Sequence, residues 1–126
     1  MIFDTDILIW FLRGNENARK AVLDNSGFSI SAVTYMELVQ GMKNKRELQI
    51  MKKMINSLGV KVLPITPQIT NDAIELVEKF YLSGSMELAD ALIAATCKAY
   101  ANTLFTSNDK HYKVVDGLDI QIFRPQ

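Results

Sequence analysis

The sequence is poor in the side chains that bind soft metals or form disulfides. Its 126 residues include one cysteine, Cys97, and one histidine, His111. A single cysteine excludes an internal disulfide and a zinc site built from thiolates. Any metal bound by this chain is therefore expected to have oxygen ligands, which narrows the candidates to Mg²⁺ or Mn²⁺.

The sequence also lacks net charge and long apolar runs. Fourteen Lys and Arg residues balance fourteen Asp and Glu residues, so the total charge does not indicate a polyanionic partner. No segment approaches the roughly 18 apolar residues that span a bilayer. The N-terminus carries Asp4 and Asp6 where a signal peptide needs positive charge. We expect a cytoplasmic protein with no membrane contact.

What remains is the composition of one soluble globular domain over residues 1–126, with 48% hydrophobic and 22% charged residues. Apolar runs bounded by turn residues predict strands at 1–4, 28–31, 60–65, 103–106 and 120–123. Between them, apolar residues at helical spacing predict helices at 32–42, 48–58 and 69–80. Further helices are predicted at 7–12, at 16–24 as a polar helix, and at 88–101 as a helix that is apolar almost all round. This alternation predicts an α/β fold: a three-layer α/β/α domain around a mostly parallel sheet of about five strands.

Two carboxylates follow the first predicted strand, where ligands bind in parallel sheets. Asp4 and Asp6 are separated by Thr5 and precede an apolar helix. One of them is explained as the N-cap of that helix, because Asp is a preferred capping residue. Only one residue is the cap, so the second acid favours a functional site.

Asp90 lies in a helical run that is apolar almost all round, with Ala94 and Cys97 on its own face. A charged carboxylate among such neighbours is costly unless it is paired or binds a metal. The alternative is a first-turn Asp that stabilises the helix dipole by roughly 0.3–1 kcal/mol. That alternative explains the position of Asp90 but not its apolar surroundings, so we favour a functional role.

Three further polar residues become candidates for the same site because Asp4, Asp6 and Asp90 are predicted there. Glu37 lies in the helix after the second strand and alone resembles an ordinary exposed Glu. Asn108 and Asp109 follow the fourth strand and suit either a turn or a ligand set. If Asp4, Glu37, Asp90 and either Asn108 or Asp109 converge at one edge of the sheet, a divalent cation relieves their repulsion.

The order of these motifs resembles the PIN-domain ribonucleases, and most closely the VapC-type toxins of toxin–antitoxin pairs. The resemblance covers essentially the whole chain. Its four motifs are Ile2-Phe3-Asp4-Thr5-Asp6, Ser31-x-x-Thr34-x-x-Glu37, Leu88-x-Asp90-Ala91-Leu92-Ile93-Ala94-Ala95 and Thr106-x-Asn108.

The resemblance implies a Mg²⁺-dependent endoribonuclease, with Mn²⁺ as an alternative, in which metal-activated water attacks the RNA phosphodiester. It implies Asp4, Glu37 and Asp90 as metal-binding acids and Asn108 at the fourth position. His111 stands where the family often has a further acid, for which the adjacent Asp109 is a substitute. Thr5 and Thr106, together with Asp6, are expected to order the acidic cluster. The resemblance also implies a homodimer and a small antitoxin partner.

RNA requires positive charge near the acids. The candidates are Arg13, Lys43, Lys45, Arg46 and Lys110. A solvated helix face is the competing explanation for the basic run at 43–53. Trp10, Phe11 and Tyr35 offer rings for stacking on a base, although aromatic residues in helices also serve as core or interface anchors.

Two other functions fit part of the pattern. A phosphohydrolase of the haloacid-dehalogenase type also begins with a strand and Asp-x-Asp, with Asp4 as nucleophile and Asp6 as acid/base. A catalytically weak PIN module that binds RNA or protein is the second, since Asn108 and His111 depart from the family pattern.

Overall fold

The structure is a computed structural model that describes residues 1–84 and 86–126. Its strands are β1 (Ile2–Phe3), β2 (Ser29–Ser31), β3 (Lys61–Leu63), β4 (Leu104–Thr106) and β5 (Ile120–Ile122). Its longer helices are α1 (Thr5–Leu12), α2 (Glu16–Asp24), α3 (Ala32–Gln40), α4 (Lys45–Ser57), α5 (Pro67–Phe80) and α6 (Leu88–Ala99). Two short helices, η1 (Tyr81–Ser83) and α7 (Asp109–Tyr112), complete the described elements.

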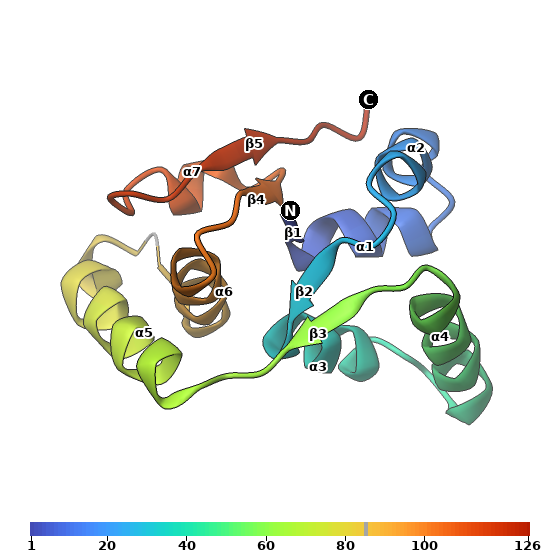
Figure 1. The fold of residues 1–126 in the computed structure, drawn as a ribbon, viewed down its shortest axis with the longest axis horizontal. Helices are drawn as coiled ribbons and strands as arrows, with labels where there is room; N and C mark the ends of the chain where they lie inside the picture. The colour runs from blue at the N-terminus through green and yellow to red at the C-terminus, as the bar shows by residue number, and fades with distance from the viewer. Residues whose placement is uncertain (85) are drawn as a thin grey trace.

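The strands form one sheet in the order β3-β2-β1-β4-β5, and every pairing is parallel (Figure 1). Strand β1 is central, with Ile2 opposite both Ser29 of β2 and Leu104 of β4. The α/β class and the five predicted strands are therefore confirmed. Because the strands are parallel, the segments after β1, β2 and β4 meet at one edge of the sheet.

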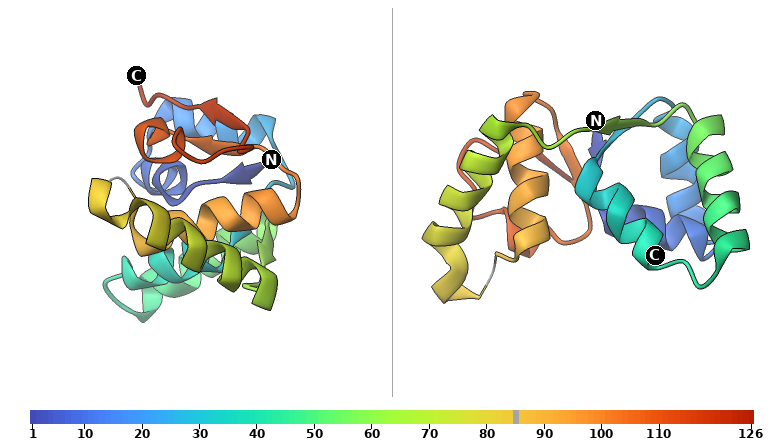
Figure 2. Two further views of the ribbon diagram at one scale, coloured as in Figure 1. Left: turned by 90° about the vertical axis from the view of Figure 1, so that its left-hand side faces the viewer. Right: turned by 90° about the horizontal axis from the view of Figure 1, so that it is seen from below.

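Helices cover both faces of the sheet, as predicted for a three-layer α/β/α arrangement (Figure 2). Ile2 and Phe3 are adjacent in β1 and point to opposite faces. Ile2 packs into a cluster with Ile69 of α5 and Ile93 of α6. Phe3 packs into a second cluster with residues of α1, α2 and α4, and its ring stacks on Phe28 at 3.9 Å between centroids. The two clusters fix the layers that position the edge described next.

Side-chain caps determine where the helices start at this edge. Asp4 caps α1 by accepting from the Thr5 backbone N–H, so α1 begins two residues earlier than predicted. Ser31 caps α3 in the same way, through the Val33 N–H. The cap residues continue directly from β1 and β2, which brings α1 and α3 side by side.

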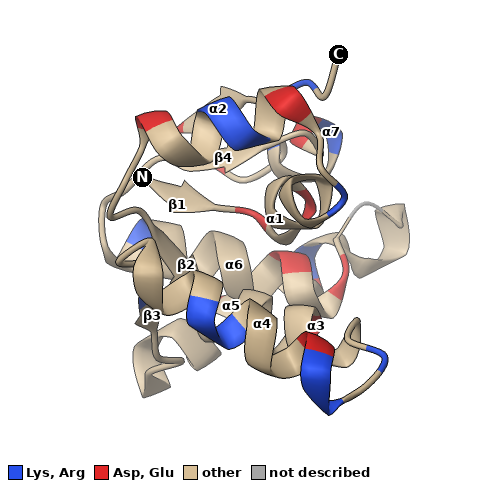
Figure 3. Ribbon diagram, turned by 90° about the vertical axis from the view of Figure 1, so that its right-hand side faces the viewer, with Lys and Arg blue, Asp and Glu red and all other residues tan. Residues whose placement is uncertain are grey.

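Basic residues gather away from the core, at the connection between α3 and α4 (Figure 3). Lys43, Lys45 and Arg46 are all exposed there. Within the described part of the chain, no helix is long and apolar enough to cross a membrane.

Candidate active site

Asp4 is a buried carboxylate at the carboxyl end of the central strand, with 4% of its surface exposed. Its Oδ1 accepts from the Thr5 N–H at 2.8 Å, and its Oδ2 accepts from the Thr106 hydroxyl at 2.6 Å. Burial, followed by the charge of Asp6 and to a smaller extent that of Asp90, raises the pKa of Asp4 to about 7, although the hydrogen bonds from Thr106 and Thr5 lower it in part. Without a nearby cation, burial and the neighbouring acids therefore disfavour the charged form of Asp4.

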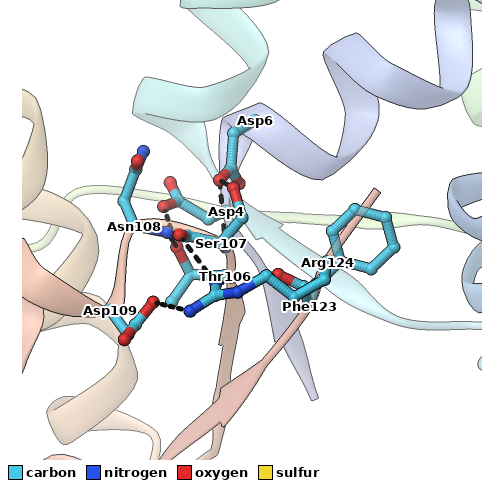
Figure 4. A network of polar contacts seen from close by, with 8 residues as sticks. All are labelled: Asp4, Asp6, Thr106, Ser107, Asn108, Asp109, Phe123 and Arg124. Atoms are coloured by element: carbon cyan, nitrogen blue, oxygen red, sulfur yellow. Dashed lines mark hydrogen bonds and ion pairs between the residues drawn. The ribbon is translucent and has the colours of Figure 1, made fainter. Parts of the chain in front are cut away.

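The loop after β4 is joined to the first strand by a chain of hydrogen bonds (Figure 4). Thr106 donates its hydroxyl proton to Asp4 and accepts from the Asn108 N–H at 2.9 Å. Asp6 accepts from both the N–H, at 3.0 Å, and the hydroxyl of Ser107. The predicted ordering residues Asp6 and Thr106 thus contact the loop that carries Asn108.

Glu37 reaches this edge from α3 and is linked to the first motif through Thr5. The Thr5 hydroxyl donates to Glu37 Oε1 at 2.7 Å, and the Thr34 hydroxyl lies 3.0 Å from the same Thr5 oxygen. Thr5 and Thr34 are buried, whereas Glu37 is exposed. The Glu37 carboxylate is therefore oriented by the buried Thr5 hydroxyl while the residue remains exposed to solvent.

Asp90 is in the first turn of α6, and both interpretations of it find support in its contacts. Its Oδ2 accepts from the Glu87 N–H at 3.2 Å in a capping box, as the helix-terminus alternative requires. It also has side-chain partners: His111 Nδ1 lies 3.2 Å from Oδ2, and the Tyr112 hydroxyl donates to Oδ1 at 3.3 Å. Only 15% of the side chain is exposed. Burial, followed by the charges of Asp4 and Asp90, raises the pKa of Tyr112, so this phenol remains a donor.

These residues occupy one edge of the sheet, but they do not form a complete metal cage. Asp90 is close enough for its charge to raise the pKa of Asp4. Among residues 1–84 and 86–126, no group of three or more His, Cys, Asp or Glu side chains is placed to hold a metal ion. The convergence of Asp4, Glu37 and Asp90 on one cation stays a prediction. Burial raises the pKa of Cys97 to about 12, so no thiolate is available at neutral pH.

The structure distinguishes Asn108 from Asp109, the two candidates for the fourth position of the predicted metal site. Asp109 Oδ1 accepts from Arg124 Nη2 at 3.0 Å, and this hydrogen bond holds the pKa of Asp109 below its usual value. Asp109 thereby faces the C-terminal segment, whereas Asn108 extends on the side of Asp4 (Figure 4). Asn108 is the better candidate for the acidic site.

Two hollows lie beside the site. A groove of about 560 Å³ between α1, α3 and α4 includes Arg13, Glu37 and Lys43 in its lining. A second pocket of about 430 Å³ includes Lys110. Of the predicted cations, Lys45 and Arg46 line neither hollow and are exposed at the start of α4, which is what a solvated helix face requires.

Four residues in these contacts were not among the predicted site residues: Thr34, Ser107, Tyr112 and Arg124. Ser107 and Thr34 lie inside predicted motifs, so a search for hydroxyl groups beside the acids would have found them. Tyr112 and Arg124 follow β4 at a distance in sequence that no local pattern connects to Asp90 or Asp109.

Comparison with known proteins agrees with this geometry. The PIN domain family model matches residues 1–118, so the chain belongs to the PIN-domain family. This membership sets aside the haloacid-dehalogenase interpretation. Ribonuclease VapC2 of Methanocaldococcus jannaschii is 29% identical over 141 residues, covering 95% of this chain and 91% of that protein.

Solved structures have the same fold. A toxin–antitoxin complex from Klebsiella pneumoniae matches with a TM-score of 0.79 and 25% identity, covering 99% of this chain and 97% of that one. DNA-bound VapBC from Salmonella typhimurium matches with a TM-score of 0.81 and 22% identity, covering 96% of each chain. At that identity, the second likeness concerns the fold alone.

Proposed function

We propose that this chain is a metal-dependent endoribonuclease and the toxin of a toxin–antitoxin pair. Its PIN-domain membership and its likeness to a protein named Ribonuclease VapC2 support the reaction class. Its likeness to the toxin–antitoxin complex from Klebsiella pneumoniae supports the biological setting. The observation that carries the proposal is the buried Asp4 carboxylate at the carboxyl end of β1, within electrostatic range of Asp90.

The residues at this edge fit a divalent cation. Burial and the charges of two neighbouring carboxylates disfavour the ionised form of Asp4 and raise its pKa. A bound cation stabilises the ionised carboxylate and offsets both effects. Mg²⁺ is usually bound by one or two carboxylates and keeps several waters, so Asp4 and Asp90 suffice as direct ligands. Glu37 and Asn108 are proposed to act through water or substrate. A bound Mg²⁺ or Mn²⁺ supplies Lewis acidity for water activation and for charge at the phosphate.

The protein's own contribution is orientation. Thr106 and the Thr5 N–H fix both oxygens of Asp4, and the Thr5 hydroxyl fixes Glu37. His111 and Tyr112, in the short helix α7, contact the two carboxylate oxygens of Asp90 and hold its side chain in place. Holding charged groups in place before the substrate arrives lowers the reorganisation that the reaction requires.

The test is RNA cleavage in Mg²⁺ or Mn²⁺, compared with the same assay in EDTA. Asp4→Asn and Asp90→Asn should each lower cleavage by about two orders of magnitude or more, because each removes a ligand charge without changing size. Asp116→Asn, an exposed residue outside the site, is the matched control and should cleave normally. RNA binding without metal-dependent cleavage would instead favour the catalytically weak binding module.

We further propose that one PIN-like domain over residues 1–126 works as a cytoplasmic homodimer inhibited by a small antitoxin. The groove between α1, α3 and α4 is suited to an antitoxin segment, because apolar Ile9, Leu12 and Ile50 line it and Glu37 lies at its rim. A segment bound there reaches the acidic edge. The check is a short gene immediately upstream whose co-expression relieves growth arrest caused by this chain.

A further inference from the structure

We infer that the pocket between Trp10, the loop after β4 and the C-terminal segment is a subsite for one RNA nucleotide next to the scissile phosphate. The inference rests on the proposed ribonuclease function and adds where and how the substrate is held. The pocket has a volume of about 430 Å³, and its lining includes Trp10, Asn108, Lys110, His111 and Arg124. That volume is within the range of pockets that hold a small organic ligand.

The pocket shares its wall with the acidic site. His111, in the lining, lies 3.2 Å from Asp90, and Ser107, also in the lining, is hydrogen-bonded to Asp6. A ligand in the pocket therefore lies against side chains that contact Asp90 and Asp6. A nucleotide bound there lies beside the edge that carries Asp4 and Asp90.

The chemistry of the lining suits a nucleotide. Lys110 and Arg124 bring two positive charges against one carboxylate, Asp109. Trp10 adds an aromatic ring, with the Arg13 guanidinium 5.9 Å from the ring centroid. Stacking on an aromatic ring and cation contacts to phosphate are the two usual means of binding single-stranded RNA. The larger groove has no aromatic residue among its described lining, so it lacks the first of these.

The wall of the pocket is already held in place. Arg124 Nη1 donates to the Ser107 carbonyl at 3.1 Å, and Nη2 donates to Asp109 at 3.0 Å. Asn15 Nδ2 donates to the Pro125 carbonyl at 2.9 Å and holds the segment that carries Arg124. With a third bond to the Phe123 carbonyl, these contacts use three of the five guanidinium N–H groups. Two are left for a phosphate, and 53% of the side chain is exposed.

The test uses Trp10, the only tryptophan of the chain, as its reporter. A short single-stranded RNA of mixed sequence is titrated in EDTA, so that binding is followed without cleavage. We expect saturable quenching of Trp10 emission. Lys110→Glu should weaken binding about tenfold. Lys61→Glu, the same charge reversal on an exposed residue of β3 at the opposite edge of the sheet, is the control and should leave binding unchanged.

A second pair of variants tests the stacking. With dye-labelled RNA and anisotropy as the readout, Trp10→Leu should weaken binding about tenfold or more, and Trp10→Phe should restore most of it. Absence of quenching, or equal effects of Lys110→Glu and Lys61→Glu, overturns the subsite. If the wild type cleaves RNA while showing no quenching, the subsite fails and the ribonuclease stands. If quenching occurs without metal-dependent cleavage, the subsite stands as an RNA-binding site and the ribonuclease fails.

Discussion

At the scale of single residues, Asp4 is held where its own charge is unfavourable. It sits at the end of the central strand, beneath two helices and beside Asp6 and Asp90. Two hydrogen bonds to its carboxylate only partly offset that environment. A residue whose charge costs stability and whose position faces other acids is typical of a functional site rather than a structural one.

This gives the metal-free protein a characteristic dependence of stability on pH. The pKa of Asp4 is about 7 in the folded chain and 3.8 as the ordinary value, so the folded state binds more protons between them. The free energy of unfolding in EDTA should therefore fall as pH rises from about 4 to about 7. The shift corresponds to a loss on the order of 4 kcal/mol. Urea denaturation at about pH 5 and about pH 8 should show about 3 kcal/mol of this loss, because the Asp4 carboxyl of the unfolded chain is already ionised at pH 5.

Asp4→Asn provides the control, because it keeps the shape and removes the ionisation. The difference in stability between wild type and this variant should be largest above pH 7, with the variant more stable there. Saturating Mg²⁺ should stabilise the wild type selectively at the higher pH. An unchanged difference between the two proteins across the pH range would contradict the assigned burial of the Asp4 charge.

Local patterns predicted which acids lie at the edge but not what each of them contacts. Asp4 and Asn108 follow strands and Asp90 lies in the first turn of a helix, which is visible in sequence, whereas Glu37 lies in the middle of α3. The hydrogen bond from Thr106 to Asp4 joins residues 102 positions apart, so it depends on the pairing of β1 with β4. Whether Asn108 or Asp109 faces the acids depends on Arg124, a residue of the last strand's extension, and no motif marks that contact.

At the scale of elements, the predictions succeeded where turn residues mark both ends of a segment and failed where a segment is very short. The helix at Glu16–Asp24 was predicted with its observed bounds, because Arg13-Gly14-Asn15 and Asn25-Ser26-Gly27 lie on either side of it. Helix α7 was missed: its four residues complete barely one turn and display no apolar spacing. Helix α1 starts at Thr5 because the side chain of Asp4 accepts from the Thr5 N–H as its N-cap.

Asn15 makes the dependence between elements testable. Its Oδ1 caps α2 by accepting from the Ala18 N–H at 2.9 Å, and its Nδ2 binds the Pro125 carbonyl. Asn15→Ala should destabilise the protein by about 2 kcal/mol, about 1 from the cap and about 1 from the tail contact. Asn15→Asp keeps the cap acceptor and loses only the donor, so it should cost about 1 kcal/mol.

Thermal and urea denaturation measure both variants. Hydrogen exchange at the Phe123 amide, which donates to the Thr106 carbonyl at 2.9 Å, separates the two contributions. Exchange there should speed up equally in Asn15→Asp and Asn15→Ala, because both lose the donor to Pro125. Equal stability of the two variants would show that the cap contributes nothing measurable. Unchanged exchange would show that the C-terminal segment is held by other contacts, such as buried Phe123 against Phe105.

At the scale of the whole molecule, the zero net charge conceals an uneven surface. The groove between α1, α3 and α4 opens on one side of the sheet, with basic residues nearby (Figure 3). On the other side, α5 and α6 enclose an apolar hollow of about 310 Å³ that includes Ile74, Val77 and Leu88. Leu88 is 72% exposed, and Leu82 of η1 is 84% exposed. Two separate apolar surfaces suit two separate partners.

The α5–α6 surface is the better candidate for contact with a second copy, because the opposite groove borders Glu37 and is left for the antitoxin. We predict a homodimer in solution. Leu88→Glu places a charge on the exposed apolar surface and should yield a folded monomer, whereas Ile50→Glu, an exposed substitution in the opposite groove, should remain dimeric. Size-exclusion chromatography with light scattering distinguishes these outcomes, and circular dichroism confirms folding.

A monomeric wild type at micromolar concentration, or a Leu88→Glu variant that still dimerises, would exclude this surface. Dissociation by Ile50→Glu alone would move the self-contact to the α1–α3–α4 groove, where it would compete directly with the antitoxin for access to the acidic edge.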